Sequence, residues 1–468
     1  VTLSRKLTDF YKSSHPYVFA LYADKKSGRI YAGESPSGRI ICLDGSGETL
    51  HTAETGEVLI TSVTGDASGY IYIGTAPHGK IFRMDSNGKL SLFCRLEDKY
   101  IWDLKMQPDG HLLAATGMNG RVWSVDGAGK GKVIFESKEL HIQCLETAPN
   151  GVIYAGGSSE GVVYQINPDG KASTCFKSIE TSIDCILYDK GTLWVASEEL
   201  LFKIDPAKGK KAYIFPENVV LFVGKDGEGH IIAGTSDMGR VYRIHPNDRI
   251  ENLFEAEINQ VTRIVPVSDG MVIATGNPGQ VIKVSSKYAA EGVFTSGIID
   301  AGRIAEFGNI QWACNLPAGS SITTQTRTGD TSSPDKTWSE WSSEYSVKEG
   351  QKIANAPGRF IQVKTNLKSD GTTTPELYWI SLFFKHKNHA PLMMLDTPEG
   401  GEKWSAVKEV SWKSYLANPE TLAFSIYISG DNGKTWNPVR ENINADLQKK
   451  TPAASDQEKS VRMKFKVL

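Results

Sequence analysis

Several short motifs in this sequence carry residue types that perform chemistry in other proteins. Gly157-Ser-Ser-Glu-Gly161 matches the G-x-S-x-G pattern, in which a strained turn between a strand and a helix presents a nucleophilic serine. Gly433-Lys-Thr435 matches the end of a phosphate-binding loop, and His386 and His389 are spaced closely enough to share a metal. Neither glycine motif is followed by a helix-forming segment, and the histidines have no carboxylate or thiol beside them. We therefore expect no serine nucleophile, no nucleotide site and no metal site at these positions.

A second group of candidates precedes apolar, β-branched segments at regular spacing. Each member is followed by Val or Ile, and the group is Tyr17, Glu57, Tyr100, His141, Ser182, Val219 and Gln260. If these segments surround one axis, the side chains meet at one opening. The polar members that could hold a small ligand there are Tyr17, Glu57, Tyr100, His141, Ser182 and Gln260. The alternative is a ring of hydrated loop ends around a solvent channel.

The elements that must position this ring are copies of one phrase. The phrase Ile30–Asp44 (IYAGESPSGRIICLD) returns as Ile71–Asp85, Leu112–Asp126, Ile153–Asn167, Ile231–His245, more loosely as Val272–Ser285, and in shortened form as Leu193–Asp205. The copies follow one another about every 40 residues, which is the period of propeller blades. Within a copy, alternating segments are separated by turns that contain Gly or Asn, and this pattern predicts four antiparallel strands. We therefore predict an all-β fold, with a seven-bladed β-propeller over residues 1–291.

The N-terminus is expected to close this ring. Leu7-Thr-Asp-Phe10 precedes the first inner strand as Leu90–Phe93 precedes Tyr100–Lys105. Residues 4–12 are therefore predicted to form the outermost strand of the seventh blade, which would join the two ends of the propeller in one sheet. The competing candidate for that strand is Lys287–Glu291, which lacks the alternation.

Two further β domains are predicted after the repeats end. Residues 292–386 are rich in Thr, Ser and Trp and contain alternating runs, which favours a β-sandwich. Lys387–Ala390 reads as a linker, and residues 391–468 are predicted to form a second sandwich in which Asn442–Lys459 is a long loop.

Two motifs in these domains are expected to be structural. Trp338-Ser-Glu-Trp-Ser342 matches the WSxWS box of cytokine receptors over five residues only, so we expect the two tryptophans to pack on the sandwich; the alternative is an aromatic platform for a sugar. The segment 429–436 matches the Asp-box pattern S-x-D-x-G-x-T-W. Its defined positions are Ser429, Asp431, Gly433, Thr435 and Trp436. Asp431 should cap a hairpin turn, Gly433 should adopt a positive φ, and Trp436 should fold into the core.

The composition excludes several kinds of partner. The 468 residues carry a net charge of -2 with 23% charged residues, so there is no basic footprint for nucleic acid. No apolar run approaches the roughly 18 residues of a membrane span. The six cysteines form no CxxC pair and are expected to be buried thiols. The chain begins at Val1 without Met and has no Asn-x-Ser/Thr sequon, which favours a bacterial protein whose signal peptide has been removed; a trimmed chain is the other explanation.

The repeated phrase, with a turn such as Ser27-Gly28-Arg29 before IYAG and the continuation G-R-[IV]-[IYW]-x-[LIV], resembles the gluconolactonase-like, NHL-like and WD-like propellers. The domains that follow resemble Ig-like or fibronectin type III-like modules of secreted bacterial proteins. The lactonase resemblance implies a divalent cation held by Glu, Asn and Asp; Glu57, Asp103 and Asp184 are near inner strands, but no Asn matches. Streptogramin lyases of similar fold use a His and Glu pair around Mg²⁺, whereas His141 and Glu57 lie two blades apart. Neither activity carries over residue by residue.

We therefore expect a non-enzymatic, secreted or periplasmic protein that binds a protein or glycan partner through the loop face of the propeller, without a cofactor. The alternatives are a metal-dependent lactonase or lyase, with Ca²⁺ or Mg²⁺ at the channel mouth, and a cell-surface spacer. The shortened loop at Glu198–Leu200 is expected to leave a notch in the ring where a partner could bind.

Overall fold

The computed structural model describes residues 1–216, 219–255, 259–386, 392–399, 407–415, 423–429, 431, 433–444 and 458–466. The described residues contain strands and no helix, so the predicted all-β class is confirmed. They divide into two compact units. The first comprises residues 1–293, 315–322 and 366–377, and the second comprises residues 294–314, 323–365 and 378–468.

The first unit is built from repeated four-stranded antiparallel sheets, as the turn spacing predicts. The first strands are β2 (Tyr17–Ala23), β6 (Leu59–Gly65), β10 (Tyr100–Met106), β14 (His141–Thr147), β18 (Cys185–Asp189), β22 (Val220–Lys225) and β26 (Gln260–Val267). The second strands are β3 (Ile30–Ser35), β7 (Ile71–Ala76), β11 (Leu112–Gly117), β15 (Ile153–Ser158), β19 (Thr192–Ser197), β23 (Ile231–Thr235) and β27 (Gly270–Gly276). The third strands are β4 (Arg39–Leu43), β8 (Lys80–Met84), β12 (Arg121–Val125), β16 (Val162–Ile166), β20 (Leu200–Asp205), β24 (Arg240–Ile244) and β28 (Gln280–Tyr288). The outer strands are β5 (Thr49–Glu54), β9 (Leu90–Arg95), β13 (Gly131–Glu136), β17 (Ala172–Lys177), β21 (Gly209–Ile214), β25 (Ile250–Glu255) and β1 (Arg5–Lys12).

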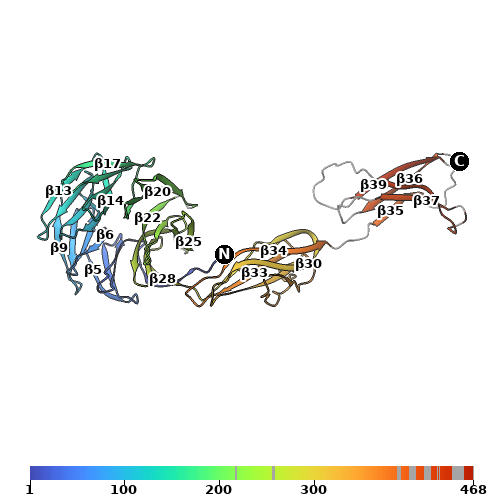
Figure 1. The fold of residues 1–468 in the computed structure, drawn as a ribbon, viewed down its shortest axis with the longest axis horizontal. Coiled ribbons are helices and arrows are strands. Elements are labelled where there is room, and N and C mark those ends of the chain that lie inside the picture. Colours follow the sequence, from blue (N-terminus) through green and yellow to red (C-terminus); the bar gives the residue numbers. More distant parts are fainter. Residues whose placement is uncertain are drawn as a thin grey trace. The chain divides into compact units, whose positions relative to one another are not determined.

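Apolar side chains on both faces of each sheet explain why the sheets pack against one another. Second strands such as β7 are buried along their whole length. One core cluster joins Ile40 of β4 to Ile60 of β6 and Ile73 of β7, and so connects two successive sheets. Figure 1 shows the sheets of this unit arranged around a common centre, with strands β6, β14 and β22 on the inside. A sheet that is apolar on both faces needs another sheet packed against each face, and a closed ring gives every sheet two such neighbours.

The N-terminal strand completes the last of these sheets. The strand expected at residues 4–12 is β1, which pairs antiparallel with β28. Its register places Leu7 opposite Val284 and Asp9 opposite Ile282. The guanidinium of Arg5 lies 4.1 Å from the ring centroid of Tyr288, which adds a cation–π contact to the ladder. The beginning and end of the repeat region are therefore held together by backbone hydrogen bonds.

The glycine that ends the loop in most copies of the phrase is required by close packing. Gly120 has φ +54, and a Cβ there would lie 2.1 Å from the carbonyl oxygen of Glu139. Gly79 is placed in the same way: a Cβ added there would lie 2.0 Å from the carbonyl oxygen of Asp98. These glycines are structural residues, because each lets one loop approach the next strand closely.

Gly120→Ala is expected to lower the free energy of unfolding by about 3 kcal/mol, the sum of a positive-φ penalty and a backbone overlap. Gly110→Ala is the matched control, because Gly110 also has a positive φ (+87) but a Cβ there would meet no atom within 4 Å. Urea denaturation of both variants would measure the difference. Equal destabilisation by the two substitutions would show that the overlap contributes nothing.

The second unit contains most of the sheets that follow the repeats. A six-stranded sheet is formed by β29 (Glu291–Thr295), β30 (Ile299–Asn315), β31 (Ser321–Gly329), β32 (Gln351–Lys352), β33 (Gly358–Lys368) and β34 (Glu376–His386). The remaining sheets are β35 (Leu392–Thr397) with β36 (Val407–Tyr415) and β39 (Glu458–Lys466), and β37 (Ala423–Ile428) with β38 (Asn437–Asn444). Strands occupy the runs predicted for residues 292–386. The sandwich arrangement and the boundaries 1–291, 292–386 and 391–468 remain predictions. The linker Lys387–Ala390 and most of the predicted loop Asn442–Lys459 lie outside the described residues.

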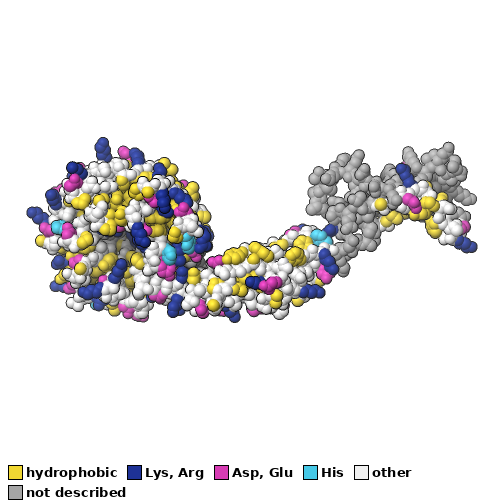
Figure 2. Space-filling view, in the orientation of Figure 1, with side chains coloured by type: hydrophobic (Ala, Val, Ile, Leu, Met, Phe, Trp, Pro, Cys, Tyr) yellow, Lys and Arg dark blue, Asp and Glu magenta, His cyan; other side chains and the backbone are white. Residues whose placement is uncertain are grey.

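The surface agrees with the composition, and the cysteines are free thiols as expected, although only two of the six are buried. Figure 2 shows Lys and Arg interspersed with Asp and Glu over the visible face of the first unit. All six cysteines are free; Cys42 and Cys144 are buried, and only Cys175 is exposed. Within the described residues, no helix has the length and apolar character needed to cross a membrane.

Candidate functional site

The first strands surround a channel that their side chains line in successive rings. Most of these strands contain a β-bulge just after their second residue, for example between Val18 and Ala20 and between Ile101 and Asp103. The mouth ring consists of residues at or shortly before the strand starts: Tyr17, Leu59, Tyr100, His141, Ser182, Val219 and Gln260. The middle ring consists of Phe19, Thr61, Trp102, Gln143, Asp184, Leu221 and Thr262. The lower ring consists of Ala20, Ser62, Asp103, Cys144, Cys185, Phe222 and Arg263.

Two cavities follow these rings along the channel. The outer cavity, of about 430 Å³, is lined by the whole middle ring and by Tyr17, Leu59 and Gln260 of the mouth ring. The inner cavity, of about 300 Å³, is lined by the whole lower ring. Asp184 and Arg263 line both cavities, so these two side chains lie where the cavities meet. The outer cavity has the size of a small-molecule site.

Glu57 does not belong to this channel, and its predicted place at the mouth was wrong. The residue equivalent to Tyr17 is Leu59, because Ile60, rather than Val58, is the fully buried residue that follows. Val58 is 48% exposed. Adjacent Val58, Leu59 and Ile60 are all apolar, so the sequence pattern fits either register.

Glu57 instead closes a turn within its own sheet. Its carboxylate lies 2.6 Å from Nζ of Lys80 and 2.8 Å from Nδ1 of His78. Burial opposes ionisation, but hydrogen bonds from Lys80 and His78 outweigh it and hold the pKa of Glu57 below its usual value. Asp98 and Glu139 occupy the equivalent positions in the next two copies and are buried with partners of their own. This row of carboxylates is structural.

Aromatic side chains dominate one part of the outer cavity. Tyr17 and Phe19 stack with ring centroids 4.8 Å apart, and Tyr100 and Trp102 stack at 5.2 Å with an interplanar angle of 3°. Nε1 of Trp102 donates a hydrogen bond to Nδ1 of His141 over 3.0 Å. Burial lowers the pKa of His141, so the neutral imidazole that accepts this bond is favoured. His141 therefore positions Trp102.

Polar groups line another part of the channel. Ser182 donates a hydrogen bond to Oδ1 of Asp184 over 2.9 Å, and the backbone N–H of Glu198 donates to Oδ2 over 2.9 Å. Burial raises the pKa of Asp184 despite these bonds. Deeper in the channel, Nζ of Lys105 lies 3.1 Å from Oε2 of Glu146. Burial acts to lower the pKa of Lys105, but the charges of Glu146 and of neighbouring Asp103 outweigh it and raise the pKa.

The residues considered for a metal-dependent lactonase or lyase do not form one site, because only Asp103 and Asp184 of the four line a common cavity. Glu57 pairs with Lys80 and His78, whereas His141 bonds Trp102. Asp103 lies in the lower ring and accepts hydrogen bonds from the hydroxyl of Ser62 and from two backbone N–H groups. Asp184 lies in the middle ring. Among the residues that the structure describes, the channel contains no group of three or more carboxylate, His or Cys ligands close enough to share an ion.

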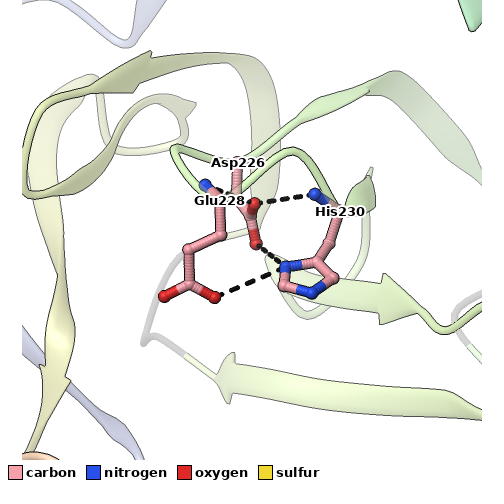
Figure 3. Close-up of side chains that lie close together, drawn as sticks. All are labelled: Asp226, Glu228 and His230. Carbon is pink, nitrogen blue, oxygen red and sulfur yellow. Dashed lines mark hydrogen bonds and ion pairs between the residues drawn. The ribbon is translucent and has the colours of Figure 1, made fainter.

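One such group does occur elsewhere, in the turn Asp226–His230 between β22 and β23. Figure 3 shows the side chains of Asp226, Glu228 and His230 converging, and Nδ1 of His230 lies 3.3 Å from Asp226 and 3.4 Å from Glu228. Nη2 of Arg243 already lies 2.6 Å from Oδ2 of Asp226. Oδ1 of Asp226 accepts backbone hydrogen bonds from residues two and four positions later, as Oδ1 of Asp66 does in its own turn. The group is therefore a capped turn with its charge balanced by an arginine.

The motifs that resemble catalytic signatures occupy structural positions. Strand β16 follows Gly161, and Ser159 donates a hydrogen bond to Oε2 of Glu139, so no nucleophile elbow is formed. Nε2 of His386 lies 2.8 Å from the carbonyl oxygen of Ala301, and His389 lies outside the described residues.

The tryptophans of the WSxWS-like segment are held in place by cations. Trp338 is buried, and the guanidinium of Arg327 lies 5.4 Å from its ring centroid and 4.6 Å from that of Trp341. Nζ of Lys364 lies 4.6 Å from the ring centroid of Trp341. These contacts support the packing interpretation, because rings engaged by cations are poor platforms for a sugar.

The Asp-box residues form the turn between β37 and β38. Asp431 accepts hydrogen bonds from the backbone N–H of Thr435 over 2.8 Å and from its hydroxyl over 2.6 Å, which lower the pKa of Asp431 to about 2. Gly433 has φ +85 and donates its N–H to Ser429 over 2.7 Å. Trp436 is 61% exposed, so its predicted place in a core was wrong. The described β37 and β38 form a two-stranded sheet, which has little buried surface for a large ring.

The channel residues that the sequence interpretation missed include Phe19, Trp102, Gln143 and Arg263. Trp102 lies two residues after Tyr100, and Gln143 two after His141, so the period of a strand could have identified both. Arg263 had no such signal, because the bulge at β26 shifts it into the lower ring.

Comparison with solved structures identifies the fold. The chain is similar to a catalytically inactive virginiamycin B lyase from Staphylococcus aureus, solved with quinupristin, with TM-score 0.53 and 14% identity over 59% of this chain and 98% of that one. It is also similar to a streptogramin B lyase, with TM-score 0.52 and 13% identity over 60% of this chain and 98% of that one. The WD40 β-propeller domain of Doa1 gives TM-score 0.49 and 13% identity over 60% of this chain and 97% of that one. No protein-family model and no curated protein sequence matches the chain. At these identities the likeness to the two lyases is one of fold alone. The repeated four-stranded sheets around a common centre (Figure 1) make the repeat region a β-propeller.

Proposed function

We propose that this chain is a non-enzymatic, extracytoplasmic binding protein whose first 291 residues form a seven-bladed propeller and that it binds a glycan at the channel mouth. The observation that carries this proposal is the pairing of stacked aromatic rings with free amides in one small cavity. Tyr17, Phe19 and Trp102 line this cavity, Tyr17 stacked with Phe19 and Trp102 stacked on Tyr100, and their remaining ring surface suits the C–H surface of a pyranose. Within the described residues, the side-chain amides of Gln143 and Gln260 have no protein partner and can bond sugar hydroxyls.

The size of the cavity favours a glycan over a folded protein as the primary ligand. About 430 Å³ admits one or two sugar rings, whereas a protein interface requires a broad surface. The lyases share only the fold with this chain, so their activity is not proposed for it.

Trp102→Ala is expected to weaken glycan binding by at least roughly tenfold, because it removes a large aromatic ring that lines the cavity. A glycan array probed with the full chain would identify ligands, and titration calorimetry would measure the loss. Trp436→Ala is the control, because that exposed tryptophan lies in the Asp-box turn. The proposal is wrong if no glycan binds, or if Trp102→Ala binds as well as the parent. A pull-down that recovers a protein lost with Trp102→Ala would instead assign the mouth to a protein partner.

A further inference from the structure

Arg263 is the cation that lies where the two channel cavities meet. It comes from β26, where the bulge between Val261 and Arg263 turns its side chain into the lower ring. It lines both the outer and the inner cavity, so a ligand that enters between the aromatic rings of the mouth reaches it next. Its guanidinium therefore lies at the deep end of the proposed glycan site.

Most of the hydrogen-bonding capacity of this guanidinium is available. Nη1 donates to the carbonyl oxygen of Thr262 over 3.0 Å. Among the residues that the structure describes, no carboxylate forms an ion pair with Arg263, and a guanidinium carries five N–H donors. The half-buried guanidinium attracts an anion more strongly than a guanidinium in bulk water does. A planar anionic group such as a carboxylate would match both its charge and the geometry of its N–H donors.

The carboxyl groups of the neighbouring rings are already bonded to other partners. Asp184 accepts from the hydroxyl of Ser182 and from a backbone N–H, and burial raises its pKa. Asp103 accepts from Ser62 and from the N–H groups of Leu104 and Leu145. At the rim, the carboxylate of Glu198 accepts two hydrogen bonds from Thr181. These contacts fix the carboxylates on the walls of the channel. The charge of Arg263 acts on Asp184, but among the described residues no ion pair takes up the N–H donors of the guanidinium, which stay available to a ligand.

We propose, building on glycan binding at the mouth, that the glycan is acidic and that its carboxylate binds the guanidinium of Arg263. A uronic acid residue fits this arrangement. Its ring face would stack on the aromatic pairs, its hydroxyls would bond Gln143 and Gln260, and its carboxylate would take the two parallel N–H donors that arginine offers.

The test compares a sugar acid with its uncharged ester. Trigalacturonate and its fully methyl-esterified form have the same rings and hydroxyls and differ in charge. Calorimetry with the full chain is expected to show the ester binding at least roughly tenfold more weakly than the acid, the effect of losing a charge-assisted bidentate contact. Arg263→Gln should remove this difference, and Arg263→Lys should retain part of it because the charge remains.

Controls separate this inference from the glycan proposal itself. Arg249→Gln removes an exposed arginine outside the channel and should leave both affinities unchanged. Melting temperatures of the Arg263 variants would establish that each is folded. Equal binding of acid and ester, or no binding of the acid, would overturn the acidic ligand; binding of neutral glycans on the array would then still support the mouth as a glycan site. An array without any bound glycan would overturn both proposals.

Discussion

Deleting residues 1–12 is expected to lower the free energy of unfolding of the propeller by on the order of 5 kcal/mol, from about 1 kcal/mol for each ladder hydrogen bond lost. The deletion removes β1, whose residues pair with β28 from Arg5 opposite Tyr288 to Lys12 opposite Gln280. It also removes the hydroxyl of Tyr11, which donates to Oε1 of buried Glu34 over 2.9 Å. Such a loss is comparable to the entire stability of many domains.

The deletion should also change the state of association. Without β1, strand β28 becomes an unpaired edge, and an exposed edge invites pairing with another chain. Thermal melting and light scattering of the deleted chain would measure both effects. Lys12→Ala is the control, because that side chain is 66% exposed and its loss should have little effect. A deleted chain that stays monomeric with an unchanged melting temperature would show that β1 does not hold the ring closed.

Asp98→Ala is expected to destabilise the propeller by about 3–5 kcal/mol, the cost of breaking a buried charged network on one side. Asp98 is 1% exposed. Its Oδ2 accepts hydrogen bonds from the hydroxyl of Thr116 over 2.8 Å and from Nε1 of Trp123 over 2.6 Å, and its Oδ1 accepts one from Asn119. Removing the carboxylate leaves the indole N–H of buried Trp123 without its acceptor, whereas Asn119 is exposed and the hydroxyl of Thr116 can still donate to the carbonyl oxygen of Arg121.

Urea denaturation at neutral pH would measure this loss. Asp109→Ala is the matched control: that aspartate side chain is 63% exposed in a turn, so its removal should change stability by no more than about 0.5 kcal/mol. Asp98→Asn should lie between the two, because an amide oxygen can still accept one of the bonds. Similar losses from Asp98→Ala and Asp109→Ala would mean that the buried network contributes no stability.

The sequence predicted the architecture of the repeat region closely because its signals are local and repeated. Turn glycines and alternating apolar residues determine local turns and strands. Because the phrase is repeated, a copy that departs from the pattern can be recognised by comparison with the others. The same reasoning placed the N-terminal strand, since Leu7–Phe10 matches Leu90–Phe93 in sequence and β1 pairs with β28 as that match requires.

The site was predicted less well, and Glu57 shows why. A run of apolar residues allows two registers, and only the packing of Ile60 against its neighbours selects the one that brings Leu59 to the mouth. A shift of two residues is enough to exchange a channel residue for a structural carboxylate. The prediction that Trp436 is buried was wrong for a related reason. The Asp-box motif determines the conformation of a turn, but burial of the tryptophan depends on whether other residues pack against its ring.

By itself the sequence determined the all-β class, the repeat and its turns, and the strand that joins the two ends of the repeat region. Turns and strand periodicity depend on the types of residues that are close together in the chain, so they can be recognised locally. The tertiary structure decided which side chains share the channel. The bulges after the second residue of most first strands place Phe19, Trp102 and Arg263 together around one axis, although these residues are far apart in the chain and carry no common motif. Their convergence follows from closing the sheets into a ring, which no local segment can encode.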